Sequence, residues 1–147
     1  MVELTFRPYL AADEAACLRI FDANTPAYFS PDERADYLRF LASTPTDYEV
    51  CVLQGAVAGA FGVFCEDANR VRLHWILLDR SAQGAGLGSK LMVRAISIAR
   101  SGGAICIDIA ASHRSAGFFE RFGAIPIAVT DHGWGPDMHR VDMELAL

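Results

Sequence analysis

The sequence predicts an α/β protein built on a mixed, mostly antiparallel sheet, and three observations lead to this. Helical and strand-like patterns alternate along its 147 residues. Hairpin turns join the strands of the first half, which makes neighbouring strands antiparallel. One strand–helix–strand unit follows, and such a crossover makes two strands parallel. We expect one domain over 1–147, in the order β-α-α-β-β-β-α-β-α-β-β, with helices on both faces of the central sheet.

The first part of the chain contributes a strand and two helices. Residues 2–7 alternate well enough for a strand, and residues 12–23 carry apolar side chains at helical spacing. The second helix has clear start signals: Ser30 suits the N-cap, Pro31 suits the first helical position and Glu33 completes a capping box.

Three strands should follow these helices. Residues 48–53 and 57–65 are apolar runs joined by Gln54-Gly55, which is typical of a hairpin turn. Residues 70–78 begin with alternating arginines and then become apolar. The three runs predict antiparallel neighbours in the sheet.

The second half contributes two helices and three strands. Apolar residues recur at helical spacing after a glycine-rich stretch, and this helix should end at the glycine pair after Arg100. A buried strand over 104–110 and a short helix over 112–122 come next. Strands over 124–130 and 138–147 close the chain.

Composition and charge exclude several classes of protein. The chain is 52% hydrophobic and 21% charged, as folded soluble proteins are. A net charge of −5 and a pI of about 5.2 argue against a nucleic-acid partner, which would need a basic face. No run of about 18 apolar residues predicts a membrane span, and the N-terminus does not resemble a signal peptide. We therefore expect a cytoplasmic protein with no membrane partner.

The cysteines predict neither a disulfide framework nor a metal site. All four lie in apolar neighbourhoods, and none belongs to a C-x-x-C pair. We therefore expect buried, reduced thiols and no bound metal. None has a base beside it in the sequence, which argues against a covalent acyl-enzyme.

Three glycines stand within five positions where a helix should begin, in QGAGLGSKLM. Glycine costs about 1 kcal/mol in a helix interior relative to alanine, so its presence needs a reason. The first N–H groups of a helix are unpaired, and glycines let a phosphate approach them. The spacing does not match a P-loop, and the third glycine comes one residue early for a dinucleotide fingerprint. Asp108, about twenty residues further on, keeps the NAD-binding alternative open.

The stretch RSAQGAGLGSKLM, residues 80–92, resembles the R/Q-x-x-G-x-G/A motif of the GNAT superfamily of acetyl-CoA-dependent N-acetyltransferases. Gln83, Gly86 and Gly88 match the motif positions. FFERFG, residues 118–123, resembles that family's later F-Y-E-K-x-G segment, and the predicted element order is also the family's. The resemblance therefore implies a GNAT-like fold over the whole chain.

The resemblance also implies acetyl-CoA as co-substrate. Its pyrophosphate would lie on the backbone of the glycine-rich loop, and the strand before the loop would pair with the pantetheine arm. The strand over 104–110 would splay away, so that the thioester enters the gap. The implied cofactor-binding residues are Ile76, Leu77, Leu78, Gln83, Gly84, Ala85, Gly86, Leu87, Gly88 and Ser89.

Two positions near the expected coenzyme depart from the family's pattern. Ser112 stands where the family often has Asn, and it can still make one hydrogen bond. Phe119 stands where the family often has Tyr, so it cannot protonate the departing thiolate. A thiolate is stable enough to need little help.

An acceptor amine must lose a proton before it attacks a thioester, because an alkyl ammonium has a pKa near roughly 10. His74 is the leading candidate for the base, since it interrupts an apolar run two residues before the expected pantetheine contacts. Glu66 and Asp67 could act instead through water. A backbone N–H near Leu77 or Leu78 could stabilise the oxyanion.

Two loops, at 24–29 and 131–137, could form the walls of an acceptor pocket. His113, near the expected thiol end, is a further titratable residue. Flat apolar side chains for the pocket come from Tyr28, Phe29, Trp75 and Trp134.

The resulting hypothesis is an N-acetyltransferase in which an amine of a small molecule or peptide attacks acetyl-CoA directly, in a ternary complex. Transfer of a longer acyl group and a non-catalytic sensor of acyl-CoA are alternatives. A homodimer is one assembly that the sequence leaves open.

Overall fold

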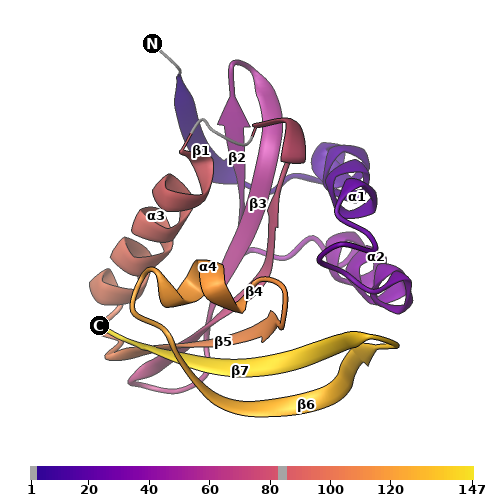
Figure 1. The fold of residues 1–147 in the computed structure, drawn as a ribbon. Helices are drawn as coiled ribbons and strands as arrows, with labels where there is room; N and C mark the ends of the chain where they lie inside the picture. The colour runs from indigo at the N-terminus through magenta and orange to yellow at the C-terminus, as the bar shows by residue number, and fades with distance from the viewer. Residues whose placement is uncertain (1–2, 83–85) are drawn as a thin grey trace.

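The computed structural model describes residues 3–82 and 86–147, and its centre is a 7-stranded sheet (Figure 1). The strand order is β1-β2-β3-β4-β5-β7-β6. All neighbours are antiparallel except β4 and β5, which confirms the predicted mixed, mostly antiparallel sheet. The strands are β1 (Leu4–Pro8), β2 (Tyr48–Leu53), β3 (Ala56–Cys65), β4 (Arg70–Leu78), β5 (Cys106–Ser112), β6 (Ile125–Gly135) and β7 (Met138–Ala146).

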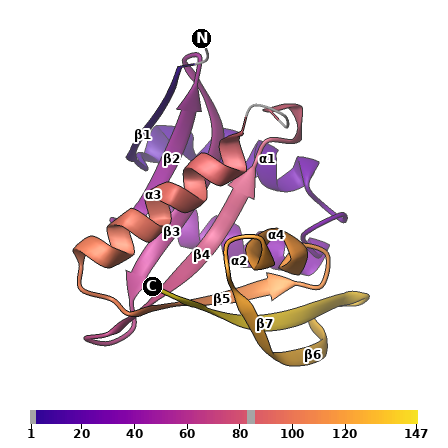
Figure 2. The ribbon, with the colours of Figure 1, turned by 60° about the vertical axis from the view of Figure 1, so that its left-hand side comes forward.

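Helices cover both faces of this sheet, as predicted. On one face lie α1 (Glu14–Ala23) and α2 (Arg34–Ala42), and on the other lie α3 (Leu87–Ser101) and α4 (Ala116–Glu120) (Figures 1 and 2). Each face has its own apolar core. One gathers side chains of α3 and α4 around β5 and β7, and the other gathers side chains of α1 and α2 around β2. None of the helices in the described part of the chain is long and apolar enough to cross a membrane.

Several boundaries in the second half differ from the prediction. Ser112 ends β5 instead of beginning a helix, because the Ser112 N–H donates to Ser115 Oγ at 3.1 Å and holds the turn before α4. The expected loop at 131–137 is largely the bulged end of β6, whose pairing with β7 shifts between Thr130 and Gly135. Cys65 is exposed, so the prediction that all four cysteines are buried was wrong at this position.

A bulge in β4 shapes the middle of the sheet. His74 pairs with Gly62 and Leu77 with Ala60, so that two residues of β4 oppose one of β3. Trp75 takes up the bulge with φ of 45°. On the other side, β4 and β5 pair only as far as Leu73 and Ile109, although both strands continue. The two strands therefore separate, as the family resemblance implied.

Candidate active site

A cavity of about 1000 Å³ opens where β4 and β5 separate. Its walls come from the segment between α1 and α2, the end of β4, the start of α3, α4 and the end of β6. Gln83, Gly84 and Ala85 lie outside the described residues. The other predicted site residues all line the cavity: His74, Ile76, Leu77, Leu78, Gly86, Leu87, Gly88, Ser89, Ser112 and Phe119.

The start of α3 presents backbone N–H groups to this cavity. The first helical hydrogen bond runs from the N–H of Lys90 to the carbonyl of Gly86 at 3.1 Å, and no side chain caps the helix. The N–H groups of Leu87, Gly88 and Ser89 precede that bond and lie at the positive end of the helix dipole. A Cβ added to Gly86 would meet nothing within 4 Å, so an anion has room to approach. These features fit the pyrophosphate of coenzyme A.

Two packing contacts shape this end of the cavity. A Cβ on Gly88 would come within 2.8 Å of the Phe118 ring, so the close packing of α3 on α4 needs glycine here. Asn24, only 5% exposed, donates from Nδ2 to the carbonyls of Ile20 and Leu78, both at 2.9 Å. Asn24 thereby joins the end of α1 to the end of β4. Sequence reasoning missed it, because its partner on β4 is distant in the sequence.

Ser112 and Phe119 line the cavity but offer no free proton donor. The Ser112 and Ser115 Oγ atoms lie 3.1 Å apart, and Ser112 Oγ also accepts the Ser115 N–H at 3.1 Å. Phe119 is 2% exposed, lies in the core and carries no hydroxyl. The hydroxyl of Ser112 is therefore occupied mainly in holding the turn before α4.

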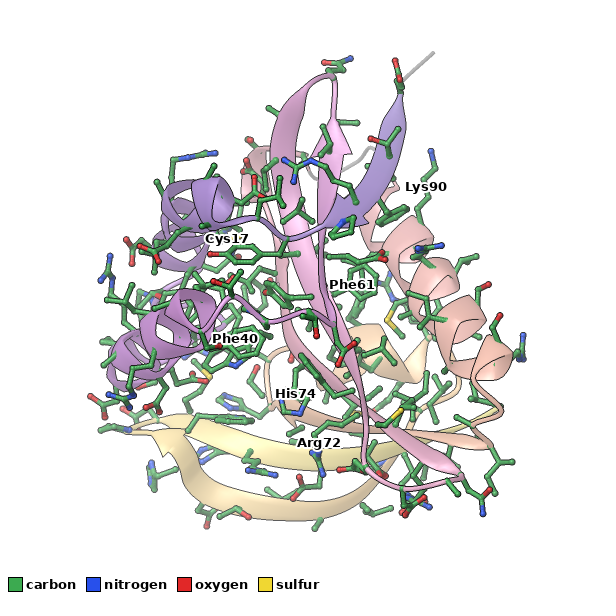
Figure 3. The ribbon with its side chains drawn as sticks, turned by 180° about the vertical axis from the view of Figure 1, so that it is seen from behind. Cys17, Phe40, Phe61, Arg72, His74 and Lys90 are labelled. Atoms are coloured by element: carbon green, nitrogen blue, oxygen red, sulfur yellow. The ribbon has the colours of Figure 1, made fainter. Side chains whose placement is uncertain are left out.

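His74 is half-buried on the wall formed by β4. Its ring makes an edge contact with Phe64, with centroids 4.8 Å apart. Figure 3 shows it between Phe40 and Arg72 in that view. Burial lowers the pKa of His74, and the nearby positive charge of Arg72 lowers it further. The imidazole is therefore neutral at physiological pH.

Glu33 is another titratable group on the cavity wall, and its place in the sequence predicted only a capping box. Its Oε2 accepts the N–H of Ser30 at 2.9 Å, which confirms that role. The side chain is buried, with 7% exposed, and the burial raises its pKa to about 7. The end of β6 closes over this region, since a Cβ on Gly135 would overlap Ser30 Oγ.

The chain that forms this cavity matches a known protein family over most of its length. The sequence profile of the Acetyltransferase (GNAT) family matches residues 17–124. The chain belongs to this family. It is therefore an acetyltransferase, and acetyl-CoA is its co-substrate.

Solved structures share the fold of this acetyltransferase at low identity. Ard1 from Thermoplasma volcanium aligns with a TM-score of 0.83 and 18% identity, over 98% of this chain and 97% of that chain. The yncA protein from Salmonella typhimurium, solved with acetyl-CoA, aligns with a TM-score of 0.72 and 22% identity, over 99% of this chain and 94% of that chain. N-acetylglutamate synthase from Neisseria gonorrhoeae, solved with coenzyme A and N-acetyl-glutamate, aligns with a TM-score of 0.71 and 13% identity. The alignment covers 99% of this chain and 35% of that chain. No curated protein sequence matches the chain.

Aromatic side chains form the far end of the acetyltransferase cavity. Tyr28, Phe29, Trp75 and Trp134 all line it, so the expected walls are present. Trp134 is fixed in place, because its Nε1 donates to the Ala111 carbonyl at 2.9 Å. These rings leave a flat, largely apolar surface in this part of the cavity.

Three residues considered as bases or relays do not line the cavity. Glu66 and Asp67 lie at the other end of β4, where Glu66 pairs with Arg72 at 2.7 Å and Asp67 caps the turn. His113 accepts the N–H of His139 on its Nδ1 at 3.1 Å. A water relay through Glu66 or Asp67 therefore has no support in this geometry. Within residues 3–82 and 86–147, no three His, Cys, Asp or Glu side chains are grouped to hold a metal ion.

Proposed function

We propose that this acetyltransferase is a cytoplasmic N-acetyltransferase that transfers the acetyl group of acetyl-CoA to an amine of a small molecule or peptide. One cavity of about 1000 Å³ runs from the first turn of α3 to the walls formed by His74 and Trp134. That continuity is the observation that carries the proposal, because it lets both substrates bind together with the thioester between them. The acceptor then attacks directly, in a ternary complex.

In this proposal the backbone N–H groups of 83–89 bind the pyrophosphate of coenzyme A. The backbone of 76–78 lies along the pantetheine arm, where β4 is no longer paired with β5. The carbonyl of Leu78 is already taken by Asn24, so the arm meets the remaining backbone groups of this segment. An N–H of Leu77 or Leu78 polarises the thioester carbonyl and stabilises the oxyanion.

Direct attack is favoured over an acyl-enzyme because no cysteine lies among the described residues that line the cavity. The amine nitrogen bonds to the thioester carbon, the C–S bond breaks, and the thiolate leaves. Neither Ser112 nor Phe119 has a free proton to give. The thiolate therefore takes its proton from the attacking nitrogen or from water. The first proton of the ammonium must go to a base in the cavity, and His74 and Glu33 are candidates for it.

The test is release of free thiol from acetyl-CoA in the presence of a panel of amino acids, polyamines and short peptides. We expect at least one amine to accelerate thiol release and to gain an acetyl group by mass spectrometry. Propionyl-CoA and longer acyl-CoA esters, run in parallel, test the acyl-chain alternative. A sensor would bind CoA in a calorimeter without releasing thiol in any mixture, and that outcome would contradict the proposal.

A further inference from the structure

Two carboxylates occupy equivalent positions at the starts of the first two helices. Asp13 ends the short 3-10 turn before α1, and Glu33 ends the corresponding turn before α2. Each accepts a backbone N–H from three residues earlier at 2.9 Å, from Leu10 and Ser30 respectively. Their exposed fractions are 6% and 7%. As helix caps the two are closely matched, so any difference between them needs another explanation.

They differ first in their charge partners. Arg7 makes two hydrogen bonds to Asp13, at 2.7 and 2.9 Å, and this pairing lowers the pKa of Asp13. No cation in the described part of the chain pairs with Glu33, and the Ser30 N–H is its one hydrogen-bond donor there. Burial therefore raises the pKa of Glu33, and the negative charge of Asp36 raises it further. Capping does not require a buried carboxylate to lack a counter-ion.

They differ also in what they face. Glu33 lines the cavity and Asp13 does not. Arg72 and Arg140 lie on the cavity walls but already pair with Glu66 and Asp142, at 2.7 and 3.0 Å. The nearby end of β6 contributes the uncharged Gly135. The charged or titratable groups that line the cavity with Glu33 are Tyr28, Arg72, His74, Asp79, Arg114, Arg121 and Arg140, and Asp32 and Asp36 lie beside Glu33.

We propose that Glu33 is the catalytic residue that takes the proton from the acceptor ammonium, an inference that rests on the proposed function. The ammonium gives one proton to the Glu33 carboxylate and becomes a neutral amine. Its nitrogen bonds to the thioester carbon, the C–S bond breaks, and the second proton passes from that nitrogen to the thiolate. Products are the N-acetyl compound and the free thiol of CoA, and Glu33 returns its proton to solvent.

The two candidate bases are separated by their affinity for a proton. Burial lowers the pKa of His74 below its ordinary value, whereas Glu33 titrates at about 7. A base takes a proton from an ammonium more readily when its own pKa is higher and lies near the working pH. Glu33 meets this requirement better than His74, which then serves as a neutral part of the wall.

The experiment compares the pH dependence of kcat/KM in wild type, Glu33→Gln, Glu33→Asp and Asp13→Asn, with CoA affinity by calorimetry as a binding control. Gln can still accept the Ser30 N–H, so the cap survives, and Asp13→Asn is the matched loss of a capping carboxylate outside the cavity. The acceptor ammonium, with a pKa near roughly 10, stays protonated across the range in which Glu33 titrates, so it adds no bend of its own near pH 7.

We expect the wild-type profile to bend at about pH 7, the value to which burial raises the Glu33 pKa. Glu33→Gln should lose the bend and about 100-fold or more in kcat/KM, with CoA affinity unchanged. Glu33→Asp should keep the bend at a reduced rate, and Asp13→Asn should keep it fully. Retention of the bend in Glu33→Gln, or a loss in kcat/KM below about fivefold, would overturn the catalytic role of Glu33 but not the proposed function. A wild-type protein that releases no thiol with any amine would instead overturn the proposed function.

Discussion

The hydroxyl of Tyr48 donates a hydrogen bond of 2.5 Å to the carbonyl of Trp75, the residue that forms the bulge in β4. Tyr48 is fully buried, and its oxygen lies 2.9 Å from the hydroxyl of Tyr37. The bulge removes this carbonyl from the β3–β4 ladder, and Tyr48 replaces the lost partner. A residue on β2 therefore stabilises the distortion of β4 beside the cavity.

Tyr48→Phe should destabilise the protein by about 1–3 kcal/mol, because it leaves the Trp75 carbonyl without its donor and removes one partner of the Tyr37 hydroxyl. Urea unfolding measures this change. Tyr37→Phe is the control, since it keeps the bond from Tyr48 to Trp75 and should cost less. Equal losses of unfolding free energy in the two variants would show that the hydrogen bond from Tyr48 to the Trp75 carbonyl adds no stability of its own.

Gly86→Val should weaken CoA binding at least about tenfold, or about 1.4 kcal/mol, because the new side chain occupies the approach to the first turn of α3. Gly103→Val, just beyond the other end of α3, is the matched control. Both glycines have positive φ, of 72° and 84°, and open space around an added Cβ. Both substitutions should therefore strain the backbone similarly. Calorimetry on the folded variants should show weaker CoA binding for Gly86→Val alone, and equal affinity in both would contradict the phosphate assignment.

His74→Gln should lower turnover by less than about fivefold and leave the bend of the pH profile in place, if Glu33 takes the proton. Steady-state kinetics from pH 5.5 to 9 provide the measurement. A loss of about 100-fold together with a vanished bend would return the role of base to His74, as the sequence first indicated.

Glu33 should also make stability depend on pH. Burial raises its pKa from 4.5 to about 7, so the folded state binds its proton more tightly than the unfolded state. The stabilisation is full below pH 4.5 and is lost as the pH rises to about 7, by on the order of 3 kcal/mol. Glu33→Gln should remove this contribution, and chemical unfolding at pH 5 and pH 8 compares the two proteins. An equal change in both proteins between these pH values would show that Glu33 is ionised in the folded state throughout.

The sequence by itself determined the fold class, most of the elements and the glycine-rich start of α3. The sequence shows local patterns: helical and strand periodicity, the capping box at Ser30 and the hairpin turn at Gln54-Gly55. Such patterns depend on neighbouring residues, so they can be recognised without the tertiary structure. The glycines before α3 are also a local pattern, because adjacent residues are enough to indicate a helix start with free backbone N–H groups. His74 could be placed near this site for the same reason, since it lies two residues before Ile76 on one strand.

Only the tertiary structure decided which carboxylate faces the cavity. Asp13 and Glu33 both precede helices and both cap them, and neither sequence pattern says which of the two faces the cavity. The difference arises because the end of β6, which is distant in the sequence, packs on the turn that contains Glu33, while Arg7 pairs with Asp13. The bulge at Trp75 depends in the same way on Tyr48 from another strand. The burial of Glu33 and the pairing of Tyr48 with Trp75 come from contacts between distant segments, and single-sequence periodicity does not contain those contacts.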